Sequence, residues 1–173
     1  GGNMTDQGTH LIDVVQWFTN TTQPRAALCY GQVYKLHPAE TPDTFCAVFE
    51  YPGFICTWTL TYTNSFQNGW GITFQGQKGT LELCETGYRI YQEPWAPNTR
   101  WVRPQPLIEK LPGGLTQTAP HIKNFLECVR TRKQPNATIE IGHQAVRTLH
   151  LANIAHHKKA RAVLGEDGRT VTV

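Results

Sequence analysis

The sequence of 173 residues has no long hydrophobic run and few cysteines. No apolar segment approaches the ~20 residues that a membrane-spanning helix needs, so a transmembrane segment is not expected. The five cysteines are odd in number and widely spaced, and the absence of any CxxC pair argues against a zinc knuckle. Four of them fall in predicted strands, where a free cysteine behaves as a small apolar residue. We therefore expect a reducing compartment and a cytoplasmic protein.

The motifs that cradle phosphates or present a nucleophile are also missing. The sequence has no GxGxxG after a strand, no GxxxxGK[ST] and no GxSxG. The net charge is only +3, and the one basic cluster, at residues 156–161, lies late in a helical stretch where cations favour the helix dipole. These absences argue against nucleic-acid binding and predict no dinucleotide cradle within this chain.

Short strands and three helices account for most of what is present. Strict alternation marks the clearest strand, where Phe54, Trp58 and Tyr62 share one face and threonines the other. Strands are expected at residues 27–34, 43–51, 54–62, 71–75, 80–84, 88–92 and 170–173. Helices are expected at about residues 5–18, from Thr118 onward, and at about residues 141–161, with a long Pro-rich loop at residues 94–114 that carries Trp95 and Trp101.

The order of helix, strands and helices predicts an α+β fold. We expect a mostly antiparallel, open-faced sheet with the helices packed on one face. No internal repeat or linker divides the sequence, so a single domain is expected over residues 1–173.

The first helix contains an unusual line of functional side chains. At 100° per residue, four positions fall within roughly 60° of each other: Asp6, His10, Asp13 and Trp17. A separate stripe is expected to face the core: Leu11, Val14, Val15 and Phe18. An imidazole one turn from a carboxylate can transfer a proton near neutral pH, which suits removal of a hydroxyl proton while a hydride leaves the same carbon.

Two simpler interpretations of the same spacing remain open. An exposed helix face with an ordinary charge pair between Asp6 and His10 would look the same in sequence. A metal site would add a third ligand such as His121 or His143, but no second pair of ligands supports one, and no metal is expected.

Several segments resemble the C-terminal domain of the Gfo/Idh/MocA family of NAD(P)-dependent oxidoreductases. GGNMTDQGTHLIDVVQWF resembles the motif that opens that domain, with its Gly-Gly, Asp, Gly, His, Ile-Asp and Trp at matching spacing. The similarity continues through TPDT at residues 41–44, FEYPG at 49–53, GQKGTLEL at 76–83, HIKNFLECVRTRKQP at 121–135 and GHQAVRTLHLANIA.

The resemblance implies a role for each residue of the first motif. Asp6 and His10 match the substrate-site aspartate and the proton-transferring histidine of the family. Asp13 matches the second aspartate, for which either a role in supporting the site or a structural role is expected. Trp17 is expected to pack within the helix layer, and the remaining histidines match no catalytic position.

The resemblance also implies what this chain would need. Family members carry an N-terminal Rossmann domain with a glycine-rich loop and a Lys-Pro segment, and neither feature is found within these 173 residues. The chain is therefore expected to be the substrate-binding half of a dehydrogenase that acts on a sugar, cyclitol or related polyol. NAD or NADP would be held by the other half, so we expect the isolated chain to be inactive and to bind no dinucleotide tightly.

A second class of function remains open, in which the chain is a stand-alone sheet domain that binds a ligand or a partner without redox chemistry. In either case the Thr-rich face of the strand at residues 54–62 is expected to stay uncovered by helices. Such a semi-polar face suits a sheet-to-sheet contact, so a homo-oligomer is expected. Family members commonly assemble in this way, which is what the resemblance implies here.

Overall fold

The computed structural model describes residues 1–66, 69–93, 105–113 and 118–173. The helices are α1 (Gly2–Thr19), α2 (Thr118–Thr131) and α3 (Ile139–Lys158). The strands are β1 (Ala26–Gln32), β2 (Thr44–Tyr51), β3 (Phe54–Thr61), β4 (Gly71–Gln75), β5 (Gly79–Cys84), β6 (Gly87–Gln92), β7 (Ile108–Lys110), β8 (Ala162–Leu164) and β9 (Val171–Thr172). These helices and antiparallel sheets confirm the predicted α+β class.

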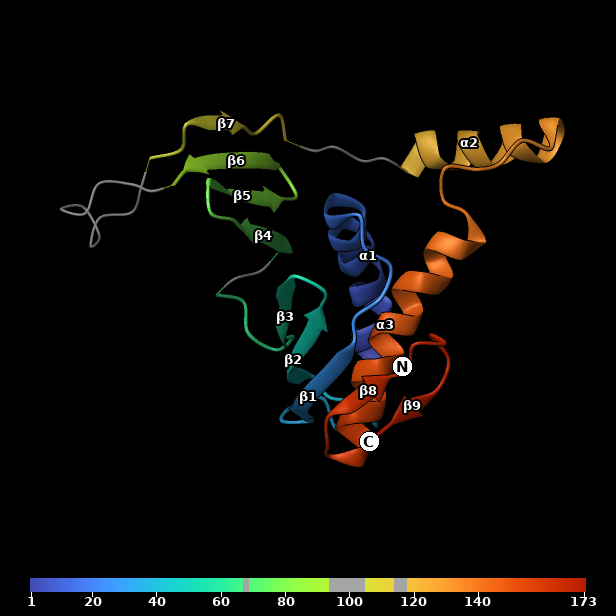
Figure 1. Ribbon diagram of the computed structural model, residues 1–173. Coiled ribbons are helices and arrows are strands. Elements are labelled where there is room, and N and C mark those ends of the chain that lie inside the picture. The colour runs from blue at the N-terminus through green and yellow to red at the C-terminus, as the bar shows by residue number, and fades with distance from the viewer. Residues whose placement is uncertain (67–68, 94–104, 114–117) are drawn as a thin grey trace. The chain divides into compact units, whose positions relative to one another are not determined.

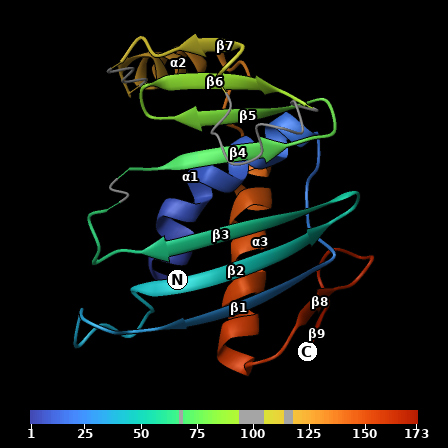
Figure 2. The same ribbon diagram turned by 90° about the vertical axis from the view of Figure 1, so that its left-hand side faces the viewer.

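The chain forms two compact units, and its strands lie in two sheets. The first unit is Gly1–Phe66 with Asn136–Val173, and the second unit is Gln67–Pro135. The first unit contains a five-stranded antiparallel sheet with the order β3-β2-β1-β8-β9. Helices α1 and α3 contact each other on one face of this sheet, behind the strands in the view of Figure 2. The predicted placement of helices on one face is confirmed for this unit.

The two faces of β2 and β3 differ as their alternation predicts. Phe45, Ala47 and Phe49 are at most 5% exposed beneath the helices. The Phe45 ring meets the Trp58 ring of β3 edge to face, with 4.8 Å between the ring centroids. On the opposite face the threonines of β3 are exposed: Thr57, Thr59 and Thr61. The aromatic face therefore takes the helices, and the threonine face stays open.

The core-facing stripe of α1 is rotated from the predicted one. Its buried residues are Met4, Gly8, Ile12, Val15 and Gln16. Of the predicted stripe only Val15 is buried, Leu11 and Val14 are half-buried, and Phe18 is 48% exposed. Trp17 is 77% exposed, so the expectation that it packs within the helix layer was wrong.

A glycine explains this rotation. A Cβ atom added to Gly8 would lie 2.4 Å from the Trp58 ring and 2.8 Å from a methyl carbon of Leu149. The backbone of α1 therefore approaches β3 and α3 at Gly8 more closely than any side chain would allow. A prediction from the spacing of apolar residues does not count a glycine as a core position, and it therefore places the core-facing stripe of α1 on the wrong residues.

A buried polar contact joins α1 to its neighbours. The Gln16 amide donates hydrogen bonds to the Tyr51 hydroxyl of β2 at 3.2 Å and to the Thr148 hydroxyl of α3 at 2.9 Å. All three residues are at most 6% exposed. Burial raises the pKa of the Tyr51 phenol, and the hydrogen bonds with Gln16 and Thr148 oppose that rise. Because a buried amide needs its partners, this contact fixes the position of α1 along the sheet.

Asp43 holds the connection between β1 and β2. This residue belongs to the TPDT segment and is 1% exposed. Its carboxylate accepts backbone hydrogen bonds from Tyr34, Lys35 and Leu36, at 2.8–3.2 Å, and one from the Thr44 hydroxyl at 3.1 Å. The bond from Leu36 is the largest of the causes that lower the pKa of Asp43 to about 2. The carboxylate thus supplies hydrogen-bond acceptors to three backbone N–H groups of the loop, in place of backbone carbonyls.

The second unit contains the antiparallel sheet β4-β5-β6-β7. Register places apolar side chains on one face of this sheet: Ile72, Phe74, Leu81, Leu83, Tyr88, Ile90 and Ile108. The other face carries an ion pair between Arg89 and Glu109 and a hydrogen bond from the Tyr91 hydroxyl to Glu82. Helix α2 also belongs to this unit, and its predicted apolar side is about half exposed, from 46% at Val129 to 58% at Phe125.

Two short strands and one helix end were not predicted. Strand β7 lies inside the expected Pro-rich loop, and β8 follows a helix that was expected to reach residue 161. Helix α3 instead ends at Lys158, because Lys159 adopts the left-handed conformation with φ 54° and caps it. Trp95 and Trp101, in the same predicted loop, lie outside the described residues.

The close approach at Gly8 predicts that a change from glycine to alanine destabilises the protein at this position, the opposite of its usual effect in a helix. Alanine is normally the better helix residue, by about 1 kcal/mol. We expect Gly8→Ala to lower the free energy of unfolding by about 1–3 kcal/mol, because the added methyl overlaps the Trp58 ring. As a control, Gly142→Ala in α3 meets open space and should raise it by about 0.4–1 kcal/mol. Denaturant unfolding measures both, and an unchanged or stabilised Gly8→Ala variant would contradict the close contact.

The buried carboxylate of Asp43 predicts a pH dependence of stability. Its folded pKa of about 2 lies below the ordinary value of 3.8, so its stabilising effect is present above pH 3.8 and is lost as the pH falls toward 2. Asp43→Asn should lower the melting temperature at pH 7, and the gap to wild type should narrow below pH 3.8. The control is Glu40→Gln, an exposed carboxylate of the same loop. A gap that does not depend on pH would contradict this assignment.

Candidate active site on helix α1

The predicted functional side chains lie on the side of α1 that faces away from its core. At 100° per residue, the centre of the Asp6–His10–Asp13 line lies roughly 160° from the centre of the buried stripe. Asp6 and His10 are exposed, and Asp13 is half-buried. The rotation imposed at Gly8 therefore leaves the imidazole and both carboxyl groups on an accessible side of the first unit. Figure 1 shows α1 in blue, with α3 beside it.

Electrostatics connects His10 with Asp13. Partial burial raises the pKa of the Asp13 carboxyl, and the nearby His10 opposes this rise. The two residues are three positions apart on the helix, a spacing at which side chains meet. The sequence suggests Asp6 as the partner of His10, whereas the interaction that the structure shows is the one between His10 and Asp13.

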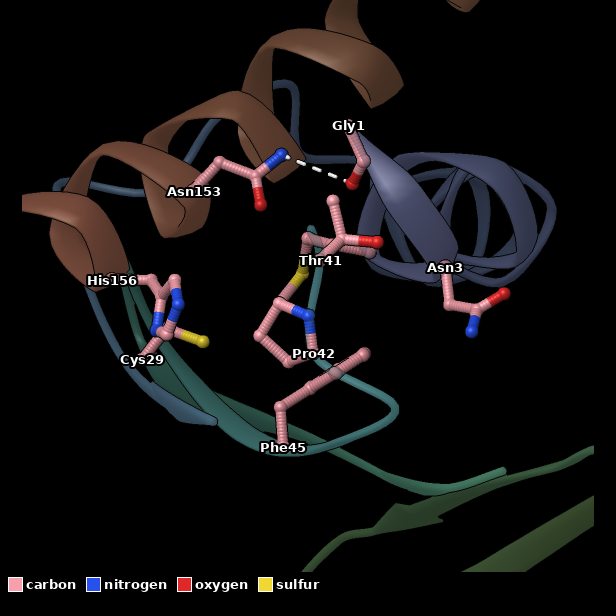
Figure 3. Close-up of a pocket in the computed structure, with 9 residues that line it drawn as sticks. Gly1, Asn3, Cys29, Thr41, Pro42, Phe45, Asn153 and His156 are labelled. Carbon is pink, nitrogen blue, oxygen red and sulfur yellow. Dashed lines mark hydrogen bonds between the residues drawn. The ribbon is translucent and has the colours of Figure 1, made fainter. Parts of the chain in front are cut away.

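A separate small hollow lies between α1, α3 and the start of β2 (Figure 3). Its lining includes Cys29 of β1 and Asn153 and His156 of α3, and the Asn153 amide donates a hydrogen bond to the Gly1 carbonyl at 3.4 Å. The free space would admit little more than one water molecule, so the hollow is too small for a sugar. No sequence motif pointed to these residues, because they come from separate elements.

The charge state of this hollow does not suit covalent chemistry. Burial is the main cause that raises the pKa of the Cys29 thiol to about 11. Burial, His157 and Lys159 lower the pKa of His156. Both groups are therefore uncharged at neutral pH, whereas a nucleophilic cysteine needs a thiolate beside a cation. The polar line on α1 is the stronger candidate site.

Within residues 1–66, 69–93, 105–113 and 118–173, no group of three or more His, Cys, Asp or Glu side chains could hold a metal ion. In the same part of the chain, no helix combines the length and the apolar composition required to cross a membrane.

Solved structures with a similar fold include sugar dehydrogenases. Levoglucosan dehydrogenase in complex with NADH and levoglucosan has a TM-score of 0.72 and 11% identity, with 96% of this chain and 51% of that chain covered. The WlbA dehydrogenase from Bordetella pertussis, in complex with NADH and UDP-GlcNAcA, has a TM-score of 0.67 and 19% identity, with 95% and 46% covered. GenD2 from gentamicin A biosynthesis, in complex with NAD, has a TM-score of 0.71 and 16% identity, with 95% and 48% covered. At these identities the likeness concerns the fold.

The comparison of sequences gives the family directly. The profile described as "Oxidoreductase family, C-terminal alpha/beta domain" matches residues 1–163. The chain therefore belongs to the Gfo/Idh/MocA oxidoreductase family, of which it represents the C-terminal domain. It spans about half the length of the similar solved structures. Among proteins with curated descriptions, none matches significantly.

Proposed function

We propose that this chain is the substrate-binding and catalytic half of an NAD(P)-dependent dehydrogenase that acts on a sugar, cyclitol or related polyol. The observation that carries the proposal is the accessible line of Asp6, His10 and Asp13 on the outward side of α1. Membership of the oxidoreductase family supports it. So do the similar structures, which were solved with NAD or NADH and, in two cases, with levoglucosan or UDP-GlcNAcA.

Proton transfer is the part of the reaction that this chain would perform. His10 takes the proton from the substrate hydroxyl, since its imidazole is exposed and reachable. Asp13 stabilises the imidazolium that results, because its carboxyl lies close enough to interact with His10. Asp6, one turn before His10, is placed to accept a hydrogen bond from a neighbouring substrate hydroxyl.

The cofactor would be held elsewhere. A nicotinamide supplies the acceptor for the hydride that leaves the substrate carbon. Dinucleotides bind through a glycine-rich turn at a helix N-terminus, and the sequence contains no such GxGxxG turn. The donor set of this chain therefore does not fit the pyrophosphate, and in the proposed enzyme a separate dinucleotide-binding half carries it.

Removal of the imidazole tests the proposed function. In an enzyme that joins this chain to a dinucleotide-binding half, His10→Ala should lower kcat by about 10²–10⁴, the usual contribution of a positioned acid–base group. His150→Ala, which removes an exposed histidine of α3, should leave kcat unchanged and serves as the control. The rate of NAD(P)H formation with a panel of polyols is the measurement. Wild-type turnover by His10→Ala would remove the proton-transfer role and favour the non-catalytic alternative.

We also propose that the chain self-associates through the open face of its five-stranded sheet. On this face the register aligns Tyr30, Cys46 and Thr59 across three strands. Tyr30 is 64% exposed and Ile55, on the same face, is 69% exposed. An ion pair between Arg161 and Glu50 lies on this face as well. Exposed apolar groups among polar ones are typical of a contact surface between copies of a protein.

A single charge at the centre of the face tests self-association. Light scattering at several concentrations should show dimers by ~100 µM, which corresponds to a modest interface. Thr59→Arg should return the chain to monomers, because the contact would bury an unpaired charge. The control is His150→Arg, which places the same charge on the exposed side of α3. A monomer at ~100 µM, or a dimer unchanged by Thr59→Arg, would count against this interface.

A further inference from the structure

The C-terminal hairpin, residues 162–173, lies next to the segment that leads out of α1. It consists of β8, β9 and the turn between them, and β8 pairs with the first two residues of β1. A further backbone hydrogen bond runs from the Leu164 N–H to the Arg25 carbonyl at 2.8 Å. Figure 2 shows β8 and β9 beside the start of β1, at one edge of the five-stranded sheet. Because so short a ladder gives little stability by itself, the side-chain contacts of the hairpin matter for its order.

Arg147 of α3 joins this hairpin to the connecting segment, residues 20–25, between α1 and β1. Its guanidinium donates a hydrogen bond to the Gly168 carbonyl of the hairpin at 2.8 Å and another to the side-chain oxygen of Gln23 in the connecting segment. A Cβ atom added to Gly168 would lie 3.0 Å from that oxygen and 3.2 Å from the guanidinium, so the three groups are in close contact. The two segments therefore share one planar donor group.

The connecting segment is also held from the side of α1. The Gln16 amide donates a hydrogen bond to the Thr22 carbonyl at 3.1 Å, and the Thr21 N–H donates one to the Gln16 carbonyl at 3.1 Å. The Arg25 N–H donates to the Glu50 carbonyl of β2 at 2.7 Å. The segment thus lies between the end of α1 and the hairpin, and its order depends on both.

The guanidinium holds the two segments less strongly than its two hydrogen bonds suggest. Both acceptors are uncharged oxygens. The Nε atom of Arg147 is buried and has no hydrogen-bond partner in the part of the chain that the structure describes. An unsatisfied buried donor costs free energy, which is regained when an opening admits water. Local opening at this point therefore costs less than the two bonds alone would indicate.

We propose that the C-terminal hairpin and the connecting segment open together as one local unit, with Arg147 as the contact that couples them. Strands β2 and β3 stay paired during this opening, because they pair over eight residues and the buried side chains of β2 lie in the core. A change in the hairpin is thereby transmitted to the end of α1. The coupling involves no substrate or cofactor, so it does not depend on the proposed function.

Amide hydrogen exchange under native conditions tests this coupling, with one amide for each segment. The Leu164 N–H reports the opening of the hairpin. The Arg25 N–H reports the opening of the connecting segment, and its acceptor belongs to β2 rather than to the hairpin. Backbone amides of β2 and β3 report global unfolding.

The first variant, Asp167→Ala, removes a contact within the turn of the hairpin and leaves Arg147 in place. The Asp167 carboxylate accepts hydrogen bonds from the backbone N–H groups of Arg169 and Thr170, both at 2.9 Å, so its loss should loosen the turn. The matched control is Glu166→Ala, which removes the exposed carboxylate next to it.

In Asp167→Ala, the exchange rates of the Leu164 and Arg25 amides should rise by the same factor, roughly tenfold. The amides of β2 and β3 should keep their rates, and Glu166→Ala should change none of them. Faster exchange of Leu164 alone would overturn the coupling, because the hairpin would then open by itself. An equal rise that includes β2 and β3 would also overturn it, since global unfolding would account for all the changes.

The second variant perturbs the unit from the other side. Gln23→Ala removes the oxygen that the guanidinium binds, and because coupling between two segments is reciprocal, it should speed the exchange of the Leu164 amide in the hairpin. This variant decides the question even if Asp167→Ala does not fold. An unchanged Leu164 rate in Gln23→Ala would contradict the role of Arg147, and unchanged rates in both variants would contradict the common unit.

Discussion

The contact of α1 with Trp58 and Leu149 at Gly8 is the constraint on which the first unit depends. Because a Cβ there would overlap both side chains, only glycine lets the helix lie so close to β3 and α3. That contact fixes the rotation of α1, and Ile12 and Gln16 then follow on the buried side at helical spacing. The same rotation turns His10 outward. A position with no side chain thereby decides which side chains of the helix are accessible.

The sequence predicts this sheet better than it predicts this helix. In β2 and β3 every second residue is aromatic or otherwise apolar and lies toward the helices, so the buried face could be assigned from the period of two. In α1 two of the buried positions are Gly8 and Gln16, which an apolar pattern does not count. The line of Asp6, His10 and Asp13 depends on helical spacing only, and these residues do lie on one side of α1, away from its buried positions. Its environment, including the effect of His10 on Asp13, required the fold.

Elements that depend on distant partners were the ones the sequence missed. Strand β8 has three residues and exists through its pairing with β1, and β7 has three residues paired with β6. Such short strands leave no period to detect. The role of Asp43 was hidden for a similar reason. Its partners are backbone N–H groups of the preceding loop, and backbone groups carry no signature in the sequence.

The layered construction of the first unit keeps its two proposed surfaces apart. The helices form one layer and the sheet the other, so the open threonine face and the outward side of α1 lie on opposite sides. A copy bound to the open face would leave His10 accessible to a substrate. Within the proposed function this arrangement matters, because the imidazole must still meet a nicotinamide carried by another half of the enzyme. If both proposals hold, assembly through the sheet and proton transfer on the helix use separate layers of the first unit, so a substitution on one surface does not touch the other.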